Sequence, residues 1–259
     1  MPVPISILGV TGKMGKSVLL AAARDSDICV VGGTTRPQSA AIGTDLGELL
    51  QSRQMNVSVQ SNVEQALFPC AIAIDFSVRE ATVQHVHAAQ NAKKALLIGT
   101  TGLSPEQIRI IENAAQDIPI ILSANFSLGM VLCLELAATF GKTLFGHCAI
   151  DIVETHHVHK KDRPSGTALS LAQAIGKGKI VYDDHAEPRN KEEIVIHSIR
   201  SGETVGEHLL VFECGHERME IKHTAHSREA FAQGALRAAK KLVAKPAGLY
   251  SLKDLFIHE

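Results

Sequence analysis

A polar stretch in the second half of the chain carries side chains that suit proton transfer. It runs from Glu154 to Thr167 as ETHHVHKKDRPSGT and packs three histidines and two lysines into six positions. Residues four apart share a face of a strand and also of a helix, so His156 and Lys160 lie together in either conformation. Because a histidine and a lysine side by side can share and deliver a proton, we expect these two residues to carry the chemistry.

Two other interpretations of this stretch stay open. A zinc site would need three or four converging ligands, but a strand would place His157 and His159 on the face opposite His156, beside lysines that repel a cation. We therefore expect no metal. An exposed basic turn would account for Lys161 and the Asp162-Arg163 pair after it without any function.

Ser165, Gly166 and Thr167 stand where the polar stretch opens into a helix. Backbone N–H groups at a helix N-terminus bind carboxylates and phosphates, and a glycine next to hydroxyl residues leaves room for such an anion. We expect these three residues to hold a small anionic substrate, a dicarboxylate, beside the proton donors.

A second chemical signal lies near the start of the chain, where Gly9, Gly12 and Gly15 form GVTGKMG between an apolar run and a helix. Glycines at such a turn let the backbone approach a dinucleotide diphosphate. The spacing departs from GxGxxG, which would require glycine at Thr11. A glycine-rich turn without a ligand is the alternative.

The residues after the second apolar run bear on the choice of cofactor. Thr34, Thr35 and Arg36 stand where an NAD-selective site usually has a carboxylate for the ribose hydroxyls. An arginine beside a hydroxyl suits the additional phosphate of NADP better, so we expect NADPH, with NADH as the second possibility. Arg36 could also be a solvated loop charge.

Three further strand ends should face the same crevice, because ligands of open parallel sheets lie at the carboxyl ends of the strands. Asn125 and Thr101 could bind the nicotinamide carboxamide or cap a helix, and Phe76 gives a weaker third candidate. The three strand ends are Asp75 to Ser77, Gly99 to Gly102, and Ser123 to Phe126.

The elements that must position these residues change in kind near Asn125. Before it, six apolar runs alternate with helix-like segments, which predicts a doubly wound, Rossmann-like parallel sheet. After it, long amphipathic strands follow one another, which predicts an α+β domain with a mixed or antiparallel sheet. The predicted strands are 3–9, 28–35, 57–60, 71–76, 93–100 and 118–124 in the first part and 148–159, 193–200, 207–214 and 218–226 in the second, with helices over 127–144, 165–178 and 228–244.

Composition excludes several classes of protein. The 259 residues are 45% hydrophobic and 20% charged, as in globular proteins, and the net charge of -1 argues against nucleic acid as a partner. Five scattered cysteines without a CxxC pair favour a reduced, cytoplasmic setting. Because no apolar stretch approaches the roughly 18 residues of a membrane span and no basic segment precedes the first apolar run, we expect neither export nor a membrane partner.

The polar stretch resembles the signature E-[AT]-H-H-x-x-K-x-D-x-P-S-G-T-A of the dihydrodipicolinate reductase family, whose members act in the diaminopimelate route to lysine. Further matches extend over nearly the whole chain: GVTGKMG, GTDLGE (43–48), IDFS (74–77), IGTTG (98–102), ANFSLG (124–129), VGEH (205–208) and FAQGALRAAKKL. The resemblance implies an NAD(P)H-dependent oxidoreductase that passes hydride to C4 of a heterocyclic substrate, 4-hydroxy-tetrahydrodipicolinate, and a proton to C3.

The resemblance also implies roles for particular residues. His156 would be the proton donor or acceptor, Lys160 the proton donor, and His157, Gly166 and Thr167 substrate-binding residues, to which the helix start adds Ser165. To the cofactor-binding residues that the resemblance implies we add Gly15 from the glycine loop and Thr35 and Phe76 from the strand ends. The expected cofactor-binding residues are then Gly9, Val10, Thr11, Gly12, Lys13, Met14, Gly15, Thr35, Arg36, Phe76, Gly99, Thr100, Thr101, Ser123, Ala124, Asn125 and Phe126.

The resemblance also implies two domains. Residues 1–126 would form the cofactor domain, and residues 228–259 would return to it. Residues 127–227 would form the substrate domain, whose sheet builds a homotetramer. Thr35 stands where family members that use both cofactors often carry glutamate, and Lys13 stands where arginine is common. Two rival functions are another Rossmann-type dehydrogenase of an amino-acid pathway and a nonenzymatic NADP-binding regulator. The former would lack the cluster from His156 to Thr167, and the latter would have lost its proton donors.

Overall fold

The computed structural model describes residues 1–176, 178–182, 190 and 192–257. The chain divides into two compact units, the first formed by Met1–Ser127 with Phe231–Glu259 and the second by Leu128–Ala230. The division after residue 230 lies within helix α8 (Glu229–Leu242). None of the described helices is long and apolar enough to span a membrane.

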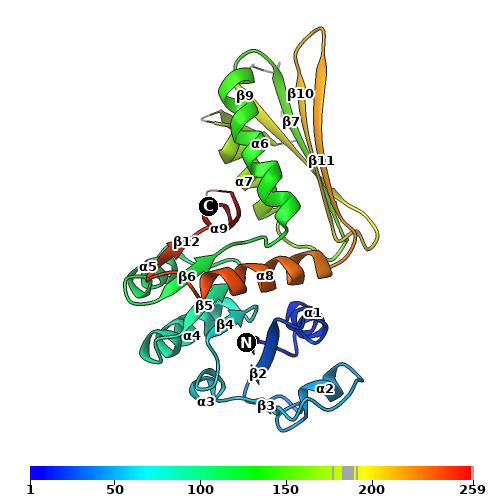
Figure 1. Ribbon diagram of the computed structural model, residues 1–259. Coiled ribbons are helices and arrows are strands. Elements are labelled where there is room, and N and C mark those ends of the chain that lie inside the picture. Colours follow the sequence, from blue (N-terminus) through cyan, green and yellow to red (C-terminus); the bar gives the residue numbers. More distant parts are fainter. Residues whose placement is uncertain (177, 183–189, 191, 258–259) are drawn as a thin grey trace. The chain divides into compact units, whose positions relative to one another are not determined.

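The first unit is built on a seven-stranded sheet in which every recorded pairing is parallel, in the order β12-β6-β5-β4-β1-β2-β3 (Figure 1). The chain moves outward from β1 in both directions, so the carboxyl ends of β1 and β4 meet where the strand order reverses. This arrangement confirms the predicted Rossmann-like sheet. Its strands are β1 (Val3–Leu8), β2 (Ile28–Thr34), β3 (Val59–Gln60), β4 (Ile72–Asp75), β5 (Ala95–Ile98), β6 (Pro119–Leu122) and β12 (Gly248–Tyr250).

The central strands of this sheet are covered on both faces. All four residues of β4 and all four of β5 are buried. Leu96 and Ile98 pack in one core with Leu67, Val86 and Ile111 from three helices, while the alternate residues of β5 point to the opposite face. The helices of this unit besides α8 are α1 (Lys13–Ala22), α2 (Leu46–Leu49), α3 (Val63–Leu67), α4 (Arg79–Asn91), α5 (Pro105–Ala114) and α9 (Leu252–Phe256).

The second unit contains a five-stranded mixed sheet in the order β11-β10-β7-β9-β8, as predicted for an α+β domain (Figure 1). The β10 strand is antiparallel to β7 and β11, whereas β9 is parallel to β7 and β8. Two helices, α6 (Leu128–Leu144) and α7 (Gly166–Ile175), belong to the same unit. The strands are β7 (Ala149–His156), β8 (Lys179–Tyr182), β9 (Glu193–Arg200), β10 (Gly206–Glu213) and β11 (Arg218–Ala225).

Strand β7 has a regular alternation that places polar side chains inside the protein. Its even-numbered residues are buried, and Ile150 and Ile152 pack with Leu171 of α7 in one apolar core. The same alternation continues to Glu154 and His156, so these polar residues lie on the buried, helix-covered face of the sheet. Their burial requires hydrogen-bond partners within the protein.

Several boundaries differ from the predicted ones. The strand predicted over 148–159 ends at His156, because the chain turns there and the Lys160 amide donates to the His157 carbonyl at 3.1 Å. The helix predicted over 165–178 ends at Ile175, and residue 177 lies outside the described residues. Short strands β8 and β12 were not predicted, since runs of four and three residues give little periodicity.

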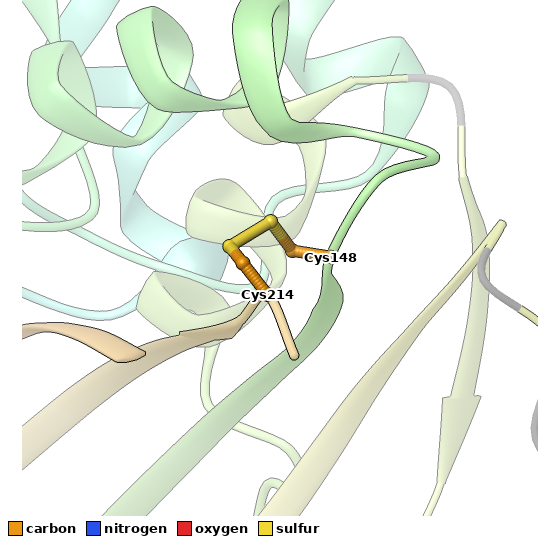
Figure 2. The surroundings of a disulfide bond; sticks show 2 residues. All are labelled: Cys148 and Cys214. Carbon is orange, nitrogen blue, oxygen red and sulfur yellow. A yellow bond between two sulfur atoms is a disulfide. The ribbon is translucent and has the colours of Figure 1, made fainter. Parts of the chain in front are cut away.

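A disulfide joins Cys148 to Cys214 at one end of the second sheet (Figure 2). The two cysteines immediately flank Ala149 and Glu213, which pair across the antiparallel strands β7 and β10. The expectation that the cysteines are all reduced is wrong for this pair. It rested on the lack of closely spaced cysteines, whereas these two are 66 residues apart in sequence and meet only through sheet register.

Contact between α6 and α7 depends on a glycine. A Cβ atom at Gly141 would lie 1.8 Å from the carbonyl oxygen of Ile175. We expect Gly141→Ala to lower the free energy of unfolding by about 1–3 kcal/mol, since backbone atoms at the end of α7 must move to admit the methyl group. Urea unfolding measures the change. Thr143→Ala, on the exposed side of the same helix, should leave the midpoint nearly unchanged, and equal midpoints for both variants would contradict the packing argument.

Candidate active site

The glycine loop of the first unit joins β1 to α1 in a tight turn. Gly9 has φ +81°, and the amides of Gly9 and Val10 donate to the carbonyl of Thr34 at 3.0 and 2.9 Å. A Cβ atom at Gly15 would lie 2.2 Å from the Gly9 carbonyl oxygen. Gly12 is the N-cap of α1 and has no side chain to occupy the helix N-terminus. This small, side-chain-free cradle at a helix start fits a dinucleotide diphosphate.

Asp75 organises the neighbouring strand ends. Its carboxylate is fully buried, accepts from the Ser77 amide at 2.8 Å and the Thr100 hydroxyl at 3.4 Å, and lies 2.9 Å from Nδ1 of His85. One side chain therefore links the ends of β4 and β5 to helix α4. Sequence analysis did not assign a role to His85, which lies inside a helix away from every motif.

Phe76 packs closely at the ends of β4 and β5. Its ring fills the place of a Cβ atom at Gly99, with Cε1 at 2.1 Å, and it meets the ring of Phe126 edge-on at 5.7 Å. A Cβ atom at Gly234 of α8 would lie 1.7 Å from the Phe126 carbonyl oxygen. Close contacts that only glycine permits thus join the loop after β4 to that after β5, and the loop after β6 to helix α8.

The remaining predicted cofactor residues lie at the strand ends of the first unit or at the start of α1. The Thr11 and Thr35 hydroxyls are 2.7 Å apart, which ties the glycine loop to the end of β2, and the Ser123 hydroxyl donates to the Asn125 carbonyl at 2.7 Å. Arg36 is exposed. Lys13 and Met14 begin α1, Thr101 is exposed after β5, and Ala124 is exposed after β6.

In the second unit, Glu154 is the centre of a buried polar cluster. It receives hydrogen bonds from Nδ1 of His156, from Nη1 of Arg200 at 2.9 Å and from the Ser165 amide at 3.2 Å. Nη2 of Arg200 forms an ion pair with Oε1 of Glu154 at 2.8 Å. Burial alone would raise the pKa of Glu154, but the hydrogen bonds from His156 and Arg200 outweigh it and lower the pKa to about 2. The carboxylate is therefore ionised at neutral pH and His156 must be the donor to it.

Helix α7 begins in the same cluster. Ser165 is its N-cap, and the Ser165 hydroxyl accepts from the Ala168 amide at 3.1 Å and lies 3.1 Å from Nε2 of His208. Gly166 is exposed with open space where a Cβ atom would be. Ser165, one of the three predicted anion-binding residues, thus shares Glu154 with His156, the predicted proton donor or acceptor.

His208 is a part of this cluster that sequence analysis did not assign. Its ring lies edge-on to that of His156 with centroids 5.2 Å apart. Burial, assisted by the charge of His156, lowers the pKa of His208 to about 3. The imidazole is neutral at neutral pH. Its motif, VGEH, matched the family signature without indicating a role for the side chain.

The loop after β7 carries the other predicted residues. Lys160 forms an ion pair with Asp162 at 2.8 Å, and the His157 and His159 rings are 6.1 Å apart. The pKa of His157 is lowered by burial and by the neighbouring charge of Arg228. Within the described part of the chain, no three histidine, cysteine, aspartate or glutamate side chains are grouped so that they could hold a metal ion.

Comparison with known proteins decides the family. The family model described as "Dihydrodipicolinate reductase, N-terminus" matches residues 3–126, and the model described as "Dihydrodipicolinate reductase, C-terminus" matches residues 129–256. A 4-hydroxy-tetrahydrodipicolinate reductase of Pseudomonas fluorescens is 38% identical over 97% of both chains. The chain belongs to the dihydrodipicolinate reductase family. It is an NAD(P)H-dependent oxidoreductase of the diaminopimelate route to lysine, which reduces 4-hydroxy-tetrahydrodipicolinate.

Other members and structures agree with this assignment. A 4-hydroxy-tetrahydrodipicolinate reductase of Acinetobacter baumannii is 39% identical over 97% of this chain and 95% of its own. A dipicolinate-bound dihydrodipicolinate reductase from Paenisporosarcina sp. TG-14 has the same fold, with a TM-score of 0.79 at 21% identity over 99% of this chain and all of its own. An amine dehydrogenase from Mycobacterium smegmatis shares the fold more distantly, with a TM-score of 0.70 at 14% identity over 98% of this chain and 96% of its own.

The lowered pKa of His208 makes a prediction for this reductase. In the unfolded chain the His208 imidazole is protonated below about pH 6.5, whereas in the native protein it stays neutral down to about pH 3. The free energy of unfolding therefore falls as the pH is lowered through this window. The expected slope from this one group is about 1.4 kcal/mol per pH unit.

Urea unfolding between pH 7 and about pH 5, above the range where carboxylates titrate, measures this slope. His208→Gln, which keeps a polar group beside Ser165, should reduce it by that amount. His216→Gln, at an exposed position, should retain the wild-type slope. Equal slopes for the wild type and the His208→Gln variant would show that the native imidazole titrates normally.

Proposed function

We propose that residues of the second unit bind the dicarboxylate substrate and supply the proton that completes its reduction. The observation that carries the proposal is that His156 and the first amide of the α7 N-terminus share one ionised carboxylate, Glu154. A proton-transfer group and an anion cradle are thereby joined at one point of the structure. This is the arrangement that a substrate with carboxylates beside its reacting carbon requires.

One substrate carboxylate is bound at the start of α7. The N–H groups of Gly166 and Thr167, the hydroxyl of Thr167 and the helix dipole all favour an anion there. The absence of a side chain at Gly166 leaves the approach open. His157, which follows β7, contributes a second contact to the substrate.

His156 and Lys160 carry out the proton transfer. When bound, the nicotinamide would supply hydride to C4 of the ring once the 4-hydroxyl has left as water with a hydrogen of C3. Lys160 donates the proton that C3 then receives, while His156 relays or stabilises the charge that this transfer creates. Nδ1 of His156 donates to Glu154, so Nε2 is the nitrogen that faces the reaction. The Lys160–Asp162 pair is partly exposed and weak, so the ammonium can exchange Asp162 for the substrate.

The first unit binds the cofactor, and the cofactor is NADPH in preference to NADH. The loop from Gly9 to Gly15 would hold the diphosphate, and the exposed Arg36 guanidinium would pair with the ribose phosphate that NADH lacks. Thr35 stands beside it without the carboxylate that NAD-selective sites use. Lys13 stands where arginine is common in the family, so it would make a single ammonium contact to phosphate instead of a bidentate one.

The enzyme assembles as a homotetramer through the sheet of the second unit. Helices α6 and α7 lie over one face, whereas Val153, Leu209 and Val211 are on the opposite face, in a hollow that also contains Asp151 and His197. A partly apolar sheet face that helices do not cover suits a second copy of the chain (Figure 1). NADPH and the substrate are metabolites of the cell interior, which supports a cytoplasmic location.

Lys160→Ala tests the assigned proton donor. We expect turnover to fall on the order of 100-fold or more, which is the effect of losing a positioned acid, with NADPH affinity nearly unchanged. The assay follows NADPH oxidation with substrate generated in place by the preceding synthase. Lys161→Ala, at the adjacent exposed position, should stay near wild-type turnover. An equal loss of NADPH affinity in Lys160→Ala would argue that Lys160 binds the cofactor instead.

Arg36→Ala tests the cofactor preference. Because a hydrogen bond to a charged group contributes about 1.5–3 kcal/mol, we expect the KM for NADPH to rise roughly 10- to 100-fold. The KM for NADH should change little. Arg109→Ala, at an exposed position of helix α5, is the control. A wild-type enzyme that strongly prefers NADH, or an Arg36→Ala variant that raises both KM values equally, would reject the assignment.

A further inference from the structure

The buried pair of Glu154 and Arg200 contacts His156, the amide of Ser165 and the backbone of Lys160. Both carboxylate oxygens of Glu154 receive an Arg200 nitrogen, at 2.9 and 2.8 Å, which is a bidentate pair. The same carboxylate accepts from His156 on one side and from the Ser165 amide on the other. Glu154 is fully buried and the Arg200 side chain is 12% exposed.

Arg200 also reaches the loop that carries Lys160. Its Nε donates to the Lys160 carbonyl at 3.3 Å, and Nη2 donates to the Asp162 carbonyl at 2.5 Å. Lys160 has no strand to hold it, because β7 ends four residues earlier. The guanidinium is therefore a direct tie between the Lys160 backbone and the sheet.

The orientation of His156 depends on the same pair. With Glu154 ionised, Nδ1 carries the proton and Nε2 points away from the carboxylate. A Cβ atom at Gly206, in the VGEH motif, would lie 3.1 Å from that Nε2, so the glycine keeps this edge of the ring clear. The network thus selects one tautomer and leaves its free nitrogen accessible to a reacting group.

We propose that Glu154 and Arg200 are positioning residues for proton transfer: Glu154 sets the tautomer and direction of His156, and Arg200 holds the backbone of Lys160 at reacting distance. This inference rests on the roles proposed above for His156 and Lys160. Neither positioning residue touches the substrate. Their effect is on turnover rather than on binding of the cofactor.

A contribution to stability alone does not explain this arrangement. A buried ion pair gains little over apolar packing of the same volume, because both charges lose their hydration. The sheet register also aligns β7 with β9 without it, since seven residue pairs from Ile150–Ile194 to His156–Arg200 follow in sequence. Only a planar, five-donor group at residue 200 can bind both carboxylate oxygens and two loop carbonyls together.

The test compares Arg200→Ala, Arg200→Lys and Glu154→Gln with the wild type and with Arg163→Ala. Arg163 belongs to the same loop but makes one exposed bond, to the Ser198 carbonyl at 2.9 Å, and does not contact Glu154. We expect Arg200→Ala to lower kcat about 10- to 100-fold, the range for groups that orient a reacting residue. The KM for NADPH should stay constant, and Arg163→Ala should remain within about twofold of wild type, as for a surface hydrogen bond outside the network.

Added guanidinium ion, below concentrations that unfold the protein, should restore part of the kcat of Arg200→Ala and none of the loss in Lys160→Ala. If Arg200→Ala does not fold, Arg200→Lys and Glu154→Gln decide, since both keep the side-chain size and should still lose turnover. Wild-type kcat in the folded variants would overturn the inference alone. An inactive wild-type enzyme, or full turnover in Lys160→Ala, would instead reject the proposed function on which it rests.

Discussion

A carboxylate that is removed from water must receive its hydrogen bonds from the protein, and each unit of this reductase contains one near the end of a central strand. Asp75 closes β4 and is satisfied by the loop that follows, by Thr100 and by His85. Glu154 lies two residues before the end of β7 and is satisfied by His156, Arg200 and Ser165. Because the donors come from different elements, each carboxylate fixes several loops at once.

The two units hold their loops in fixed positions by different means. In the first, glycines at positions 15, 99 and 234 allow backbone and ring atoms to meet at distances that any side chain would prevent. In the second, charged side chains span longer distances between strands and loop. These differences fit the proposed roles, since a diphosphate is recognised by backbone N–H groups, whereas proton transfer needs side chains of defined tautomer.

Periodicity predicted the parallel sheet and the mixed sheet, because long apolar runs are local properties of the chain. The spacing of His156 and Lys160 is also local, and their roles stay a prediction. Periodicity did not predict Arg200, His208 or His85, since their importance comes from strand pairings and helix packing between distant residues. The pairing of His156 with Lys160 was inferred for a continuing strand or helix, and neither is present from His157 to Lys160, because β7 ends at His156. The Cys148–Cys214 bond was missed for the same reason, as it depends on the register of β7 with β10.

Burial alone does not decide how a histidine behaves in this structure, and the neighbouring pair of His156 and His208 illustrates the point. Both lie on the helix-covered face of the sheet, 5.2 Å apart. His156 has an ionised carboxylate against Nδ1, whereas His208 has only the Ser165 hydroxyl, and burial lowers the pKa of His208 to about 3. Two charged imidazoles at this distance would repel each other, so a neutral His208 spares the proton-transfer role proposed for His156 that repulsion.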